Sequence, residues 1–267
     1  MLRPVLAQLA SVETMVTQAG GPVRPALVHA AEQWAQFASW LCRNTADWAG
    51  AQARQMQTLE WAAELGDRTM IATALAGKSE TAAYAGQPDA AIALARAAQR
   101  DTRAATGQRA LAAEFEARGH ALAGDTVAAE RKQGEAQDLA AAFAARPADR
   151  RPWSYWMTPA FFQHEAGITC AHLASDPRWH ARAVTLLEPA TNDEGIWASA
   201  NNSTFMTFAH AQAGDVDNAC AAGLQASAAV RVGGSVRNAA ILAQIHADLA
   251  ARYPGDARVK ELAEALA

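Results

Sequence analysis

The sequence predicts an all-α protein, organised as a right-handed solenoid of about five helical hairpins with terminal capping helices. Two observations support this. Much of the hydrophobic content of 51% is alanine, a residue that favours helix and lets helices approach closely. In addition, five short turns rich in Gly or Asp are each followed by an alanine that begins a second helix-like run. These alanines are Ala51, Ala91, Ala129, Ala183 and Ala219, at intervals of 40, 38, 54 and 36 residues.

A recurrence of this length is typical of helical-hairpin repeats, and the tetratricopeptide repeat (TPR), with a period of about 34 residues, is the nearest. A repeat array grows linearly, so a chain of 267 residues does not need one large core. We therefore expect residues 1–267 to form one TPR-like α-solenoid domain.

Apolar spacing, glycines and prolines place the expected helices in chain order. Residues 2–18 carry apolar side chains at helical spacing and end before Gly20-Gly21-Pro22. A last long helix at 235–253, and a short one after Pro254-Gly255-Asp256, would cap the array. The five hairpins are expected at 25–44 with 47–65, 68–85 with 88–104, 107–123 with 126–144, 159–174 with 178–190, and 195–213 with 216–231.

The long third interval has a local cause. Residues 146–152 read Arg-Pro-Ala-Asp-Arg-Arg-Pro, and two prolines so close together cannot continue a helix. We expect a loop insertion at about residues 145–158, with Trp153 and Trp156 at its exit. These tryptophans either close over the groove as an aromatic lid above a planar or apolar ligand, or anchor the loop to the array.

Charge and composition argue against several classes of protein. The net charge is −4 and no Lys/Arg cluster exceeds a few residues, whereas a DNA-binding domain usually presents a basic face. Three cysteines, odd in number and far apart, favour reduced core thiols. Residues 1–20 are amphipathic rather than a signal peptide, and no window is apolar enough to span a membrane. We expect a cytoplasmic protein that makes no direct DNA contact and enters no membrane.

Sequence motifs for metals and cofactors are also missing. His164 and His172 lie eight residues apart and lack the i, i+4 spacing of a metal-binding helix. No nucleophile elbow, P-loop or dinucleotide-binding glycine pattern occurs. We therefore expect no metal site and no cofactor.

Two runs are similar to TPR hairpins: Asp47-Trp48-Ala49-Gly50-Ala51 and the segment 86–95, Gly-Gln-Pro-Asp-Ala-Ala-Ile-Ala-Leu-Ala. More specifically, the chain resembles the C-terminal TPR-like region of actinobacterial regulators of the xenobiotic-response-element type, including a central Trp-x-Tyr-Trp stretch at 153–156. Those regulators carry a helix-turn-helix domain before the array, whereas this sequence leads directly into the first expected helix, so we expect either a stand-alone array or a trimmed regulator. The resemblance implies a ligand sensor, a protein adaptor or a scaffold reused for chemistry.

In a TPR hairpin the first helix lines the concave groove, so the groove residues can be assigned by pattern. At any one position, the alternative is a solvated polar residue on an open face. The run Asn201 to Thr204 is either an N-cap and first turn or a hydrogen-bonding patch facing a ligand. The expected ligand-binding residues are Trp40, Glu80, Tyr84, Glu114, Arg118, Trp153, Trp156, Phe162, Glu165, His172, Asn201, Thr204 and Phe208.

These residues favour a non-enzymatic, regulatory binding protein that holds a small molecule or short peptide in its concave groove, with a partner protein as a further ligand class. The alternative is an enzyme of secondary-metabolite biosynthesis on the same scaffold. Paired carboxylates beside Arg118 in a closed pocket would favour the enzyme, and an open groove the binding protein. In the enzyme, acid–base catalysis would fall to Glu80, Glu114, Glu165 and His172.

Overall fold

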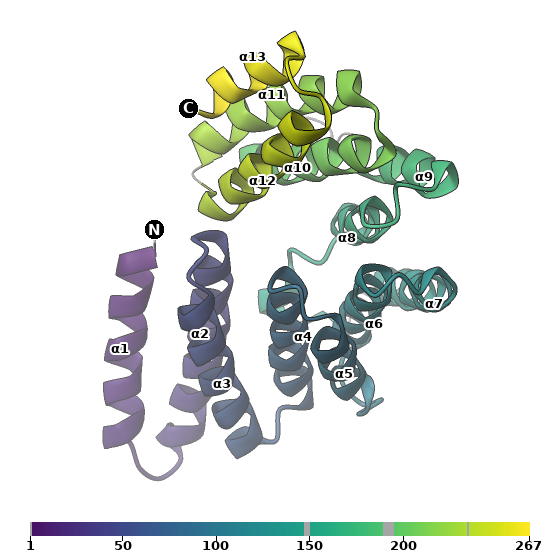
Figure 1. The fold of residues 1–267 in the computed structure, drawn as a ribbon. Coiled ribbons are helices and arrows are strands. Elements are labelled where there is room, and N and C mark those ends of the chain that lie inside the picture. Colours follow the sequence, from purple (N-terminus) through teal and green to yellow (C-terminus); the bar gives the residue numbers. More distant parts are fainter. Residues whose placement is uncertain (1, 147–149, 189–194, 234) are drawn as a thin grey trace. The chain divides into compact units, whose positions relative to one another are not determined.

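The computed structural model describes residues 2–146, 150–188, 195–233 and 235–267. These residues form helices joined by turns and short loops, with no strand among them (Figure 1). The predicted all-α class is confirmed. The helices are α1 Leu2–Gln18, α2 Val23–Asn44, α3 Trp48–Leu65, α4 Arg68–Tyr84, α5 Pro88–Gln99, α6 Thr106–Leu122, α7 Thr126–Ala144, the 3₁₀ turn η2 Pro152–Ser154, α8 Pro159–Ala171, α9 Pro177–Leu187, α10 Gly195–Ala213, α11 Val216–Gly233, α12 Val236–Arg252 and α13 Ala257–Leu266.

The chain divides into two compact units, each described by itself. Unit 1 comprises residues 1–123 and 127–158, and unit 2 comprises residues 124–126 and 159–267. In unit 1 each helix from α1 to α5 packs on the next, and α4 also contacts both α2 and α6. In unit 2 the long helix α10 contacts α8, α9, α11 and α12, and α13 packs on α11 and α12. The winding of the hairpins into a right-handed TPR-like solenoid, and the single domain, stay predictions.

The turn alanines that define the repeat are all fully buried: Ala51, Ala91, Ala129, Ala183 and Ala219 are each 0% exposed. The backbone carbonyls of two of them accept equivalent hydrogen bonds from serine side chains. Ser39 Oγ donates to the Ala51 carbonyl at 3.3 Å, and Ser79 Oγ donates to the Ala91 carbonyl at 2.8 Å. Since both pairs span twelve residues and lie forty apart, the first two hairpins repeat the same helix–helix contact.

Local signals explain why the helices begin and end where they do. Asp67 accepts hydrogen bonds from the backbone N–H groups of Thr69 and Met70 and so caps α4. Gly66 ends α3 in the left-handed conformation, at φ +67°. Gly119 instead serves packing, because a Cβ there would lie 2.7 Å from Ile92 Cγ1, and its absence lets α5 and α6 approach closely.

The predicted helix at 88–104 is five residues too long, because α5 ends at Gln99. Asp101 accepts a hydrogen bond from the backbone N–H of Arg103 at 3.0 Å and binds the Arg103 guanidinium at 2.9 Å. This side-chain-to-backbone turn competes with helix over residues 101–104. The helices predicted at 159–174 and 178–190 also end early, at Ala171 and Leu187.

The cysteines are buried free thiols, Cys42 in unit 1 and Cys170 and Cys220 in unit 2. Burial raises the pKa of both Cys42 and Cys220 above the ordinary thiol value. The thiolate, which is the reactive form, is therefore disfavoured at these two positions.

Candidate functional site

The predicted groove residues of the first two hairpins make specific contacts within unit 1. Glu80 pairs with Arg43 at 3.1 Å, and both side chains are almost buried. Tyr84 stacks on Trp48 with ring centroids 5.6 Å apart, and Trp40 stacks on Phe37 at 5.8 Å. Trp40 also packs against the apolar cluster that joins α1 to α2.

Helix α6 carries two more predicted residues in an unusual setting. Glu114 and Arg118 are each 2% exposed, within a stretch from 111 to 120 that is buried at every position. The Arg118 guanidinium lies 5.1 Å from the centroid of the Phe115 ring. Buried charges are costly unless they are paired, so α6 holds more ionisable groups than apolar packing alone requires.

The segment after α7 is attached to α6. Gln108 Nε2 donates to Met157 Sδ at 3.1 Å, and Ser154 Oγ donates to the Arg151 carbonyl at 2.8 Å. Trp153 and Trp156, on either side of Ser154, are partly buried. The bond from Gln108 holds the end of this segment to α6, and the role of the two tryptophans, lid or anchor, stays a prediction.

Unit 2 contains the other predicted residues. Asn201 lies at the centre of a polar network that joins three helices, with its side chain 2.6 Å from His164 Nε2 on α8 and 2.9 Å from Arg237 on α12. Its neighbours are buried inside α10, so the run from Asn201 to Thr204 is not an N-cap and first turn. Thr204 Oγ1 donates to the Ala200 carbonyl of its own helix at 2.7 Å.

The remaining predicted residues of unit 2 lie on α8, its C-terminal turn and α10. Glu165 is 7% exposed. Phe162 packs edge-on against Phe161 at 5.5 Å, and the His172 ring packs edge-on against Phe208 at 5.1 Å. The predicted residues therefore fall into two sets, one in each unit, and a single concave site that combines them stays a prediction.

A cavity that the sequence reasoning missed lies within unit 1, with a volume of about 380 Å³. His29 of α2 and Asp67 and Arg68 at the start of α4 contribute to its wall. Arg103, from the turn before α6, and Arg151, from the segment before η2, line the same cavity. Its volume lies in the range of small-molecule sites, and its wall contains both acidic and basic groups.

A titratable group with a strongly raised pKa lies directly behind this wall. Glu32 is 0% exposed; one carboxyl oxygen lies 2.7 Å from His29 Nδ1, and the other makes no hydrogen bond with any described residue. Burial raises the pKa of Glu32 to about 7, the bond to His29 opposes this, and the nearby Asp67 carboxylate adds to it. A carboxyl with this pKa changes its protonation state near neutral pH.

The basic groups of the cavity are engaged to different degrees. Arg68 and Arg103 share the carboxylate of Asp101, at 3.1 and 2.9 Å. Arg151 makes no side-chain hydrogen bond or ion pair with any residue that the structure describes, although its charge lowers the pKa of Glu32. Arg151 is therefore the cation of this cavity that is ready for an anionic ligand group.

A second cavity of about 370 Å³ lies over α5, α6 and α7 and has a different character. At its base Glu116 is buried and binds Arg96 at 2.8 Å, Gln99 at 2.8 Å and Lys132 at 3.0 Å. Burial would raise the pKa of Glu116, but these bonds outweigh it and the pKa is lowered. Glu116 is thus a satisfied structural ion, in contrast to Glu32.

One sequence signal could have indicated the first cavity. Val28, Ala31 and Ala35 mark the buried face of α2, and Glu32 belongs to that face by its spacing. A glutamate at an apolar position, three residues after a histidine, is a candidate for a perturbed pair. Asp67 and Arg151 could not be added to it from the sequence, because tertiary folding brings them there.

No protein-family model matches the chain, and neither the curated proteins nor the solved structures contain a match to it. None of the described helices combines the length and the hydropathy needed to cross a bilayer. The resemblance to regulator arrays therefore stays a prediction, and function must be argued from the geometry of the unit 1 cavity.

Proposed function

We propose that this protein is a regulatory, non-enzymatic binding protein whose ligand is a small zwitterionic molecule or the end of a short peptide. The observation that carries the proposal is the cavity of unit 1. Asp67 and His29 line it, the buried Glu32 carboxyl lies behind His29, and Arg151 adds a cation to the same wall. The regulatory role rests on the resemblance to regulator arrays.

The chemistry of the wall selects the ligand class. A ligand ammonium group would be attracted to Asp67 and to the His29–Glu32 pair. A ligand carboxylate would be attracted to the guanidinium of Arg151, which can bind it through two parallel hydrogen bonds. A molecule with one charge only would engage one of these groups and gain nothing from the other.

The test is a binding screen on the full chain with free amino acids and dipeptides, first by thermal shift and then by calorimetry. We expect a hit that Arg151→Ala and Asp67→Asn each weaken by about tenfold or more, as expected for loss of a charge-assisted bond. Arg3→Gln, on the exposed face of α1, is the matched control and should leave the affinity unchanged. A ligand whose affinity is the same in all four proteins would place the binding site elsewhere.

A second candidate function is favoured by one observation, the pKa of Glu32 at about 7. A carboxyl poised near neutral pH and bonded to a histidine that lines a cavity is suited to general acid–base catalysis. In that case a ligand found in the screen would be turned over, and His29→Gln would abolish turnover while binding persists. A ligand recovered unchanged after prolonged incubation with the wild-type protein would exclude catalysis on that ligand.

A further inference from the structure

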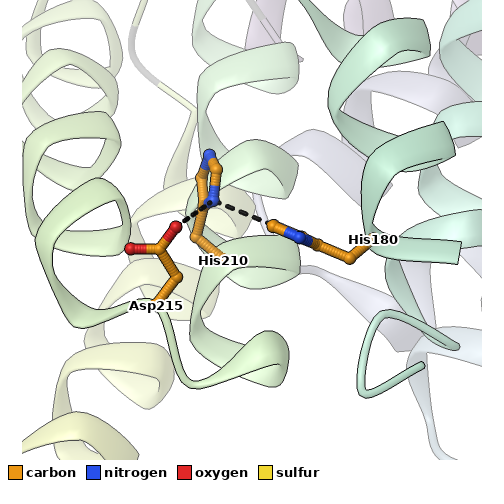
Figure 2. Close-up of side chains that lie close together, drawn as sticks. All are labelled: His180, His210 and Asp215. Carbon is orange, nitrogen blue, oxygen red and sulfur yellow. Dashed lines mark hydrogen bonds and ion pairs between the residues drawn. The ribbon is translucent and has the colours of Figure 1, made fainter. Parts of the chain in front are cut away.

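Unit 2 contains a cluster of metal-ligating side chains that is separate from the cavity of unit 1. Figure 2 shows His180 of α9, His210 of α10 and Asp215 of the following turn pointing toward one another. His180 Nε2 lies 3.0 Å from His210 Nδ1, and His210 Nδ1 lies 3.5 Å from Asp215 Oδ2. One potential ligand atom from each residue falls within 4.8 Å of the other two.

Local structure holds the three side chains in place. Asp176 caps α9 by accepting from the Arg178 N–H at 2.8 Å, and His180 follows in the first turn. At the end of α10, Gly214 adopts φ +77°, and the backbone N–H of Asp215 donates to the His210 carbonyl at 3.0 Å. This turn folds Asp215 back beside His210, so two of the ligands are fixed by a single helix end.

The spacing of the donor atoms suits a divalent transition metal. Zinc binds imidazole nitrogen and carboxylate oxygen at about 2.0–2.2 Å in a tetrahedron, which places neighbouring ligand atoms roughly 3.3 Å apart. The observed separations of 3.0 and 3.5 Å lie on either side of that value. Two nitrogens and one carboxylate oxygen would fill three positions, and the partly exposed Asp215 leaves the fourth to water or a ligand atom.

The protonation states also suit metal binding. Burial lowers the pKa of His210, and the nearby His180 lowers it further, although Asp215 opposes both. Hydrogen bonds from Asn218 lower the pKa of Asp215 below the ordinary carboxyl value. Both directions favour the forms that bind metal, a neutral imidazole and a carboxylate.

We propose that His180, His210 and Asp215 form a binding site for a divalent transition-metal ion, with zinc as the ion of matching geometry. The ion would replace the direct contact between the two imidazoles and link α9 to the turn between α10 and α11. Without an ion, one imidazole donates a hydrogen bond to the other. The three residues are spread over 36 positions, which is why no sequence motif marks them.

The proposal is tested by titrating Zn²⁺ into the whole chelator-treated chain at pH 7.5 and measuring the heat of binding by calorimetry. We expect one saturable site that His180→Gln and Asp215→Asn each weaken by about tenfold or more. His246→Gln, on α12 of the same unit, is the matched control. His29→Gln is the second control, because His29, Glu32 and Asp67 also bring ligand atoms within 4.8 Å of one another.

The outcomes are distinct. Weakening by His180→Gln and Asp215→Asn but by neither control supports the site. No saturable binding, or binding that only His29→Gln weakens, overturns it and leaves a hydrogen-bonded histidine pair. Circular dichroism of each variant checks folding. A Zn²⁺-dependent rise in the melting temperature of the wild-type protein, reversed by excess chelator, gives a second readout without mutation.

Discussion

Replacing Glu32 by Gln tests the central electrostatic feature of unit 1. The pKa of this carboxyl is 4.5 in an ordinary setting and about 7 in the folded chain. The folded chain therefore holds this proton more tightly than the unfolded chain does. Its contribution to stability is fully present below pH 4.5 and is lost as the pH rises to about 7. The difference of roughly 2.5 pH units corresponds to about 3 kcal/mol.

Glutamine has the shape of the protonated carboxyl and does not ionise. We therefore expect Glu32→Gln to match the wild type at pH 4 and to be more stable at pH 8, by up to about 3 kcal/mol. Urea denaturation of both proteins at intervals between pH 4 and pH 8 measures the difference.

Glu116 provides a matched control, because its pKa is shifted in the opposite direction to that of Glu32. It is equally buried, but its bonds to Arg96, Gln99 and Lys132 lower its pKa. Ionised Glu116 stabilises the fold above the ordinary carboxyl pKa, and this contribution is lost on acidification. Glu116→Gln should therefore be less stable than the wild type at pH 7, and the gap should narrow toward pH 4. If Glu32→Gln is destabilised at pH 8, or its difference from the wild type is independent of pH, the assignment of Glu32 is wrong.

Further predictions concern packing. Gly119→Ala should lower the free energy of unfolding by about 1–3 kcal/mol, because its methyl group would lie 2.7 Å from Ile92 Cγ1. Gly134→Ala in α7, where a methyl group meets no atom within 4 Å, should leave the free energy of unfolding unchanged or raise it by up to about 1 kcal/mol. Urea denaturation measures both variants, and equal effects of the two alanines would contradict the close approach of α5 and α6. Asn201→Ala removes the 2.9 Å bond to Arg237 and should destabilise the protein by about 1–3 kcal/mol, whereas a change within error in the thermal melt would show that the network contributes nothing.

The helix boundaries could be predicted because their causes are local. The ends of the helices predicted at 2–18 and 195–213 match the structure to the residue, at Gln18 and Ala213. Glycine in the left-handed conformation and aspartate caps act over four residues, so the sequence displays them directly. The helix that was predicted too long, α5, ends at a turn made by Asp101, a residue that helix periodicity alone does not mark as a boundary.

The sites were predicted less well because tertiary contacts make them. Glu80 was expected to be a groove carboxylate, and its partner Arg43 lies 37 residues earlier on another helix. Glu32 is visible in the sequence only as a charge on an apolar face. Arg151 follows α7, so five helices, α3 to α7, separate it from Glu32 along the sequence. His180 and His210 are likewise brought together across 30 residues.

The buried thiols give the chain a built-in means of comparing its two halves. Cys42 reports on unit 1, and Cys170 and Cys220 report on unit 2, since none can react with a bulky disulfide reagent until the helices around it separate. A Cys170→Ala, Cys220→Ala double variant leaves one natural probe on the first half, and Cys42→Ala leaves the second half's own probes. The rates at which the thiols of the two variants react with the reagent would therefore show whether the two units open independently or together, without any foreign label.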